Sequence, residues 1–91
     1  MNSNVELDEN SIDIINAVKA EAARFGFDGK SLAVRMGHDR NWIYERYRYR
    51  KPFDTNDLGI IAKILGVPVS LIFQSAELGS KMRASSMEVT A

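Results

Sequence analysis

Apolar residues near the start of the chain recur at intervals of three and four positions. These residues are Ile12, Ile15, Val18, Ala22 and Phe25. Residues at this spacing share one face of an α-helix. Asn10 or Ser11 supplies a side-chain oxygen that can cap the start of such a helix, and Gly26 provides a typical end. The segment therefore predicts an amphipathic helix with these five apolar side chains turned inward.

Two shorter helical patterns follow, separated by only three residues. Asp28 precedes the first, residues 29–36, which ends at Gly37. Asp39 caps the second, residues 39–49, and the glycine permits the positive φ of a tight turn. The predicted inward residues of the pair are Leu32, Ala33, Met36, Ile43 and Tyr47. Two short helices joined in this way predict a helix-turn-helix unit over residues 29–49.

The remaining pattern predicts two more helices. Asp54 or Thr55 caps the fourth helix, Asp57 completes a capping box with Asp54, and Gly66 ends it. Its buried stripe is predicted to be Leu58, Ile61, Ala62 and Leu65. Pro68 suits the first position of a fifth helix, in which Val69, Ile72 and Phe73 pack against the first and fourth helices.

No segment shows a strand pattern, so we expect an all-α, five-helix domain. Residues 9–79 form this domain in the prediction. Residues 1–8 are predicted to be a flexible N-terminal arm. The polar stretch 80–91 lacks an apolar stripe and is predicted to be a flexible C-terminal tail.

Charge changes the interpretation of these helices because it is unevenly distributed. The chain has a net charge of zero, but residues 1–23 carry −4 and residues 24–51 carry +5. A basic island over a helix-turn-helix favours a nucleic-acid partner, although a solvated charged face has the same composition.

Several function classes lack the residues they need. The chain has no cysteine and a single histidine, His38, so it offers neither a disulfide nor a cysteine- or histidine-built metal site. We find no catalytic constellation, because the acidic pair Asp54 and Asp57 is explained by capping. We therefore expect no enzyme activity and no cofactor. The acidic N-terminus is unlike a secretory signal, and no apolar run approaches the roughly 20 residues of a membrane span, so a cytoplasmic location is expected.

The order of these features resembles a known family. The segments LAVRMG, DRNWIYERYRYRKPFD and DLGIIAKILGVPVSLIF are similar to those of Cro/repressor-type helix-turn-helix domains, also called the XRE family. The last segment is the most specific, and with the preceding helix the resemblance covers about residues 11–75. Several phage repressors and prophage regulators look like this. The resemblance implies a lambda-repressor-like fold whose third helix, residues 39–49, enters the major groove of DNA.

The resemblance also implies which residues read bases. They are Arg40, Asn41 and Tyr44, with Trp42 and Glu45 beside them. Arginine matches the O6 and N7 acceptors of guanine, and asparagine pairs with adenine N6 and N7. Two of these residues have alternative interpretations. Trp42 is equally well explained as a core anchor, and Glu45 as a helix-surface partner of Arg48 or Tyr49.

Phosphate contacts in the family come from the start of the second helix and from the turn after the third. Here these positions are Gly29 or Lys30, and Arg48, Arg50 or Lys51. Tyr49 lies between the basic residues, and its hydroxyl can also bind a phosphate. Glutamine usually occupies the position of Gly29, and small residues often occupy those of Trp42 and Tyr44, so this chain departs from the pattern there.

The predicted function is sequence-specific binding of double-stranded DNA by a transcriptional repressor or phage-type immunity regulator, in a bacterial cell or a phage-infected host. One alternative is a protein-binding adaptor or antitoxin that uses the acidic first helix. Another is an architectural or recombination-directing factor that bends DNA. Both a monomer and a homodimer are compatible with the sequence. The candidate dimer surface is the fifth helix, with Leu71, Ile72, Phe73, Leu78 and Met82.

Overall fold

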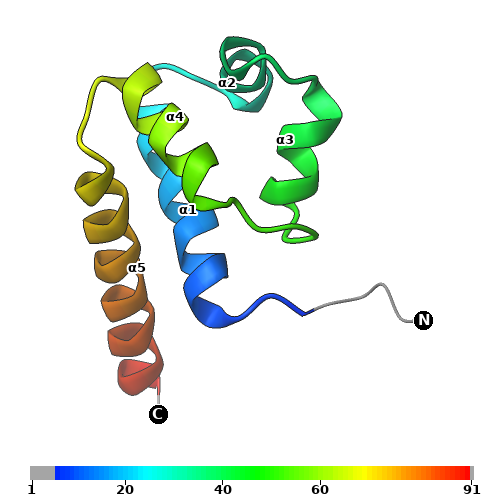
Figure 1. Ribbon diagram of the computed structural model, residues 1–91. Coiled ribbons are helices and arrows are strands. Elements are labelled where there is room, and N and C mark those ends of the chain that lie inside the picture. The colour runs from blue at the N-terminus through cyan, green and yellow to red at the C-terminus, as the bar shows by residue number, and fades with distance from the viewer. Residues whose placement is uncertain (1–5, 91) are drawn as a thin grey trace.

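The computed structural model describes residues 6–90, with side chains as far as Ser85, and contains five helices in that part of the chain and no strand. They are α1 (Glu9–Arg24), α2 (Gly29–Met36), α3 (Arg40–Tyr47), α4 (Thr55–Leu65) and α5 (Val69–Thr90). In Figure 1, α1 and α5 run side by side, and α2 and α3 form the opposite side of the molecule. The predicted all-α, five-helix architecture is confirmed.

Four of the helices begin in the same way, with an aspartate at the N-cap. The carboxylates of Asp8, Asp28, Asp39 and Asp54 each accept the backbone N–H three residues later, at distances of 2.7–3.0 Å. Asp57 returns a bond to the Asp54 N–H at 3.0 Å, which completes the predicted capping box. The cap of α1 is Asp8, where Asn10 or Ser11 was predicted, because the N–H of Ser11 is already satisfied by Asp8. The helix consequently begins two residues before Ser11.

Near both ends of the described part of the chain, the structure shows features that the sequence did not predict. Residues 80–90, predicted as part of a flexible tail, continue α5 as a helix. Arg83 in this extension donates to the buried Asp13 carboxylate of α1 at 2.6 Å, a contact that no local pattern reveals. At the other end, Leu7 packs against the core, whereas most of the predicted arm, residues 1–5, lies outside the described residues. The division into arm, domain and tail otherwise stays a prediction.

The core lies where all five helices meet. Its largest fully buried side chains come from each of them: Ile15, Val18, Leu32, Ile43, Ile61 and Ile72. Phe25, Val69 and Phe73 were predicted to point inward but are 40–44% exposed. Phe25 lies past the last residue of α1, and in α5 the buried positions are Ile72 and Ala76, one turn apart. The inward face of α5 is therefore narrower than the sequence suggested.

Membrane insertion by one helix finds no support in the described part of the chain. None of its helices is long and apolar enough to cross a bilayer alone. The segments Thr55–Leu65 and Val69–Ser85 meet the length and composition only as a pair, bent by 104°.

Removing the side chain of Ile43 tests the attachment of α3 to the core. Ile43→Ala should lower the free energy of unfolding by about 2–5 kcal/mol, because it leaves a cavity at a fully buried position. Urea unfolding followed by circular dichroism measures this change. Val34→Ala is the control, because Val34 is 63% exposed on α2 and should change stability little. Equal losses in the two variants would contradict the described core.

Candidate nucleic-acid interface

α2 and α3 form the predicted helix-turn-helix. Gly37 has φ 82°, and the N–H of His38 returns to the Ala33 carbonyl at 2.9 Å, which closes α2 and starts the turn. Ala33 is fully buried, so its small side chain lets the neighbouring elements approach closely. α3 ends at Tyr47, where the prediction extended it to residue 49.

The outer face of α3 carries four of the five predicted base-reading residues. Arg40, Tyr44 and the C-cap Arg48 lie four residues apart, so they form one row along the helix. The guanidinium carbons of Arg40 and Arg48 are each 5.9 Å from the centroid of the Tyr44 ring. Arg40 and Asn41 are exposed, and Glu45 is half-buried beside them. This face combines two cations, an amide, a phenol and the carboxylate of Glu45.

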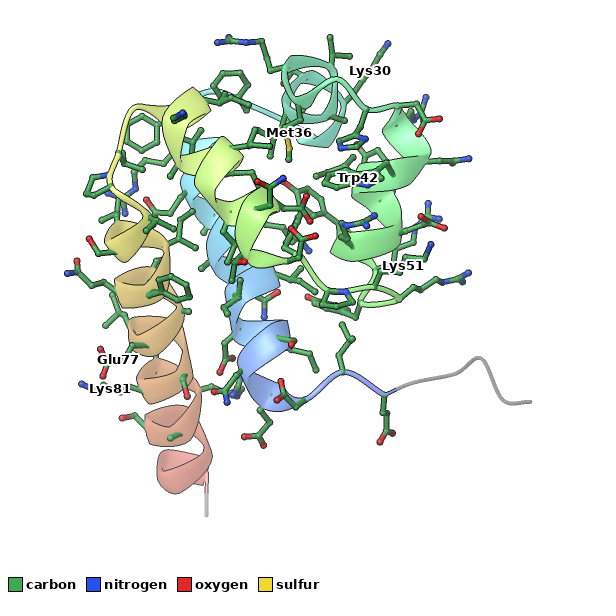
Figure 2. All side chains as sticks on the ribbon, viewed as in Figure 1. Lys30, Met36, Trp42, Lys51, Glu77 and Lys81 are labelled. Atoms are coloured by element: carbon green, nitrogen blue, oxygen red, sulfur yellow. The ribbon has the colours of Figure 1, made fainter. Side chains whose placement is uncertain are left out.

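Trp42 lies on the other side of the helix. Figure 2 shows it on the inner side of α3, toward α4. His38 stacks on its indole ring at 3.8 Å with an interplanar angle of 4°, and the Arg46 guanidinium lies 3.9 Å from the ring centroid. The two groups are too large to share one ring face at these distances, so both faces are covered. Phe53, at 6.0 Å, flanks the same ring. Of the two interpretations that the sequence allowed for Trp42, this placement favours the packing role over base reading.

Tyr44 lies over the start of α2. A Cβ atom at Gly29 would come within 3.0 Å of the Tyr44 ring carbon Cζ and its hydroxyl oxygen. Gly29 is buried as a result, which does not support the predicted phosphate contact at its backbone. The absence of a side chain at position 29 therefore leaves the space that the Tyr44 ring occupies. Lys30, beside them, is exposed and extends from α2 in Figure 2.

The start of α2 also carries a negative charge. The Asp28 carboxylate accepts the backbone N–H of Ser31 at 2.8 Å, and this hydrogen bond lowers the pKa of Asp28 below its usual value. The carboxylate thus already occupies the positive end of the α2 dipole. Of the two positions on α2 that were predicted to contact phosphate, Gly29 is buried, whereas Lys30 carries an exposed cation.

Glu45 pairs with two basic residues other than its expected partners, Arg48 and Tyr49. Its carboxylate oxygen lies 3.6 Å from Lys51 Nζ and 3.9 Å from Arg46 Nη1. The chain folds back after α3, as shown by the bond from the Arg50 N–H to the Glu45 carbonyl at 2.9 Å. This return brings Lys51 next to Glu45, an outcome that helical spacing along residues 39–49 could not predict.

The turn after α3 carries the remaining predicted phosphate contacts. Arg48, Arg50 and Lys51 are exposed. Tyr49 has φ 65°, and its hydroxyl donates to Asn16 Oδ1 of α1 at 2.6 Å. Tyr47, predicted to point inward, is half-buried, and burial raises the pKa of Tyr47 to about 12.

Lys19 is a neighbour of this turn that the sequence did not reveal. Its Nζ atom lies 5.6 Å from the ring centroids of both Tyr47 and Tyr49. Lys19 is the one basic residue among the first 23, so its charge offered a weak signal, but its position depends on how α1 packs. No group of three acidic or histidine side chains with metal-binding geometry occurs in the described part of the chain.

No protein-family model and no curated protein sequence matches this chain. Among solved structures, it is similar to the crystal structure of the clp gene regulator ClgR from Corynebacterium glutamicum. The TM-score is 0.79 and the identity is 19%, over 94% of this chain and 90% of that one. At this level of identity the likeness establishes the fold, in agreement with the predicted architecture. Membership of the XRE family and a phage origin stay predictions.

Double substitution at Gly29 and Tyr44 tests their close approach. Alanine in place of a helical glycine usually stabilises by up to about 1 kcal/mol. Gly29→Ala should raise the free energy of unfolding by less than this, because its methyl group displaces the Tyr44 ring. In a Tyr44→Ala background the same substitution should gain about 0.5–1 kcal/mol more, as measured by a urea-unfolding cycle.

Gly59→Ala provides the control for this cycle. Gly59 lies in α4, and a Cβ atom there would meet nothing within 4 Å. Its effect should be the same in both backgrounds. A Gly29→Ala effect that does not depend on Tyr44 would contradict the contact.

Proposed function

We propose that this protein binds double-stranded DNA sequence-specifically by placing α3 in the major groove. The observation that carries the proposal is the division of α3 into two faces. Ile43 and Trp42 attach the inner face to the core. On the outer face Arg40 and Asn41 are exposed, and Tyr44 is half-buried. A helix held from behind and bearing donors in its first turn suits direct readout of base edges.

The surrounding charges support the same function. Lys30 lies on α2, and the exposed cations Arg48, Arg50 and Lys51 lie at the far end of α3. Cations on both sides of a reading helix can contact the phosphates that border the groove and so fix its register. The proposed interface therefore comprises Arg40, Asn41, Tyr44 and Glu45 for bases, and Lys30, Arg48, Arg50 and Lys51 for phosphates. Trp42 and Gly29 are left out because both are covered.

The biological role that fits best is a transcriptional repressor or phage-type immunity regulator of the XRE family, acting in the cytoplasm of a bacterium or an infected host. Occupying an operator requires no chemistry beyond binding. The fold is shared with ClgR, a protein described as a clp gene regulator. A repressor of this kind often binds as a dimer with half-sites about 34 Å apart. For such a dimer, α5 offers Phe73, Leu78 and Met82, but Ile72 is fully buried and drops out of the surface.

The acidic first helix gives less support to the adaptor alternative. Asp8 is engaged as the N-cap of α1, and Asp13 is buried against Arg83. Glu21 is also buried, next to Arg24. Much of the negative charge of residues 1–23 thus serves the fold, which leaves a smaller acidic surface than the sequence suggested.

Selection of bound sequences from a random duplex pool tests the proposal, and Arg40 provides the decisive variant. Arg40→Ala should weaken binding to the selected site by about 1–3 kcal/mol and relax preference at one base pair. Arg40→Lys keeps the charge but loses the two-pronged donor, so it should relax the same position with a smaller loss of affinity. Recovery of no enriched sequence by the parent protein would refute sequence-specific binding.

Lys51 and Lys81 form a matched pair for the phosphate contacts. Each is exposed and pairs with one glutamate, at 3.6 Å and 3.9 Å. Lys51→Ala should weaken binding to all duplexes about equally and make the dependence of log Kd on log salt shallower by about one unit. Lys81→Ala, on α5, should leave both quantities unchanged. Equal effects in fluorescence-anisotropy titrations would exclude the turn after α3 from the interface.

A further inference from the structure

Tyr49 has an unusual backbone conformation. Its φ of 65° makes it the one non-glycine residue with a positive φ in the described part of the chain. A side chain makes this left-handed region unfavourable, and residues persist there only when their surroundings hold them. Such residues are concentrated at functional sites, so the conformation calls for a physical reason.

Other helix ends in the same protein use glycine for this purpose. α1, α2 and α4 are followed by Gly26, Gly37 and Gly66, with φ values of 88°, 82° and 74°. At the end of α3, the Tyr49 N–H bonds to the Arg46 carbonyl and the Arg50 N–H to the Glu45 carbonyl, both at 2.9 Å. This is a helix-closing pattern in which glycine is the usual residue. The chain thus places tyrosine where glycine would fit with less strain, which points to a role for the side chain.

The Tyr49 side chain connects the turn to α1. Its hydroxyl donates to Asn16 Oδ1 at 2.6 Å across 33 residues of sequence. The Lys19 ammonium, one turn further along α1, lies 5.6 Å from the ring centroid. A hydrogen bond and a cation–π contact therefore hold the ring on α1. Tyr49 as a residue is 40% exposed, so it contributes little to the core.

The residues around Tyr49 are those that the proposed function requires at the phosphate backbone. Arg48 precedes it, and Arg50 and Lys51 follow it, all with exposed side chains. We infer that Tyr49 is a positioning residue: anchored on α1 by Asn16 and Lys19, it fixes the basic turn so that its cations are preorganised for phosphates. This inference rests on the proposed DNA binding. It replaces the predicted role of the Tyr49 hydroxyl as a phosphate ligand, because that hydroxyl is already engaged with Asn16.

Asn16→Ala and Tyr49→Phe remove the two ends of the same hydrogen bond, and together they separate anchoring from direct contact. Each should weaken binding to a random-sequence duplex of about 25 base pairs by roughly threefold to fivefold at about 0.1 M salt, with a shallower salt dependence. The double variant should bind like either single variant. The midpoint of urea unfolding should stay close to that of the parent, because the contact is exposed. Tyr49→Gly should unfold at an equal or higher urea concentration, because the strain is relieved, and should bind more weakly than Tyr49→Phe.

Trypsin provides a readout that does not depend on DNA. If Tyr49 fixes the turn, native-state cleavage after Arg48 and Arg50 should be roughly threefold or more faster in Asn16→Ala, as followed by mass spectrometry. Cleavage after Lys63, in α4, is the internal control and should not change.

Two results would overturn the positioning role. One is loss of DNA binding in Tyr49→Phe with full binding in Asn16→Ala, which would make the hydroxyl a direct phosphate ligand. The other is unchanged trypsin cleavage in both Asn16→Ala and Tyr49→Gly. A third result separates the two proposals: the parent protein binds no duplex, but cleavage of the turn accelerates in both variants. In that case the anchoring of the turn by Tyr49 is supported. The proposed DNA binding, and with it the role assigned to the turn, is refuted.

Discussion

The attachment of α3 to the rest of the domain is the constraint on which the proposed interface depends. α3 has eight residues, and isolated helices of this length are not stable in water, so packing must hold it. Ile43 supplies that packing at a fully buried position. The stack of His38, Trp42 and Arg46 side chains is a second attachment, and it also links the turn to the helix. Because both attachments use the inner face, Arg40 and Asn41 on the outer face remain exposed.

The outer face has a construction of its own. Tyr44 fits over Gly29, so the start of α2 and the middle of α3 share one surface. The Arg40 and Arg48 guanidinium groups approach the Tyr44 ring, which restricts two long side chains before any ligand arrives. Restricting them in advance lowers the entropy lost on binding. The phenol thus organises the row of donors in addition to any contact that it makes itself.

Local signals were sufficient to predict much of the fold. Aspartates followed by helical patterns predicted the N-caps of α2 and α3, and for α4 the prediction left Asp54 and Thr55 as alternatives. Glycines predicted the ends of α2 and α4, because these features depend on a few adjacent residues. The cap of α1 was misplaced because Asp8, Asn10 and Ser11 all carry suitable oxygens within four positions. The narrow inward face of α5 was missed because Phe73 and Ile72 are both apolar, and only tertiary packing distinguishes the exposed Phe73 from the buried Ile72.

The site was harder to predict, because its geometry depends on contacts between distant segments. The resemblance to a known family implied Arg40, Asn41 and Tyr44 as base readers. It did not indicate that His38 and Arg46 would cover Trp42. The hydrogen bond from Tyr49 to Asn16 and that from Arg83 to Asp13 span 33 and 70 residues. The explanation of Gly29 likewise required the position of the Tyr44 ring. Residue type suggested the chemistry, whereas tertiary packing decided which side chains are available for it.

The measurement that tests this account most directly is a titration of isotopically labelled protein with its selected duplex, followed by backbone amide NMR shifts. The account predicts that the largest changes lie in α3 between Arg40 and Tyr47 and extend to Lys30 and the turn at Arg48–Lys51. Changes confined to the α1–α5 side of the molecule, with α3 unaffected, would contradict it.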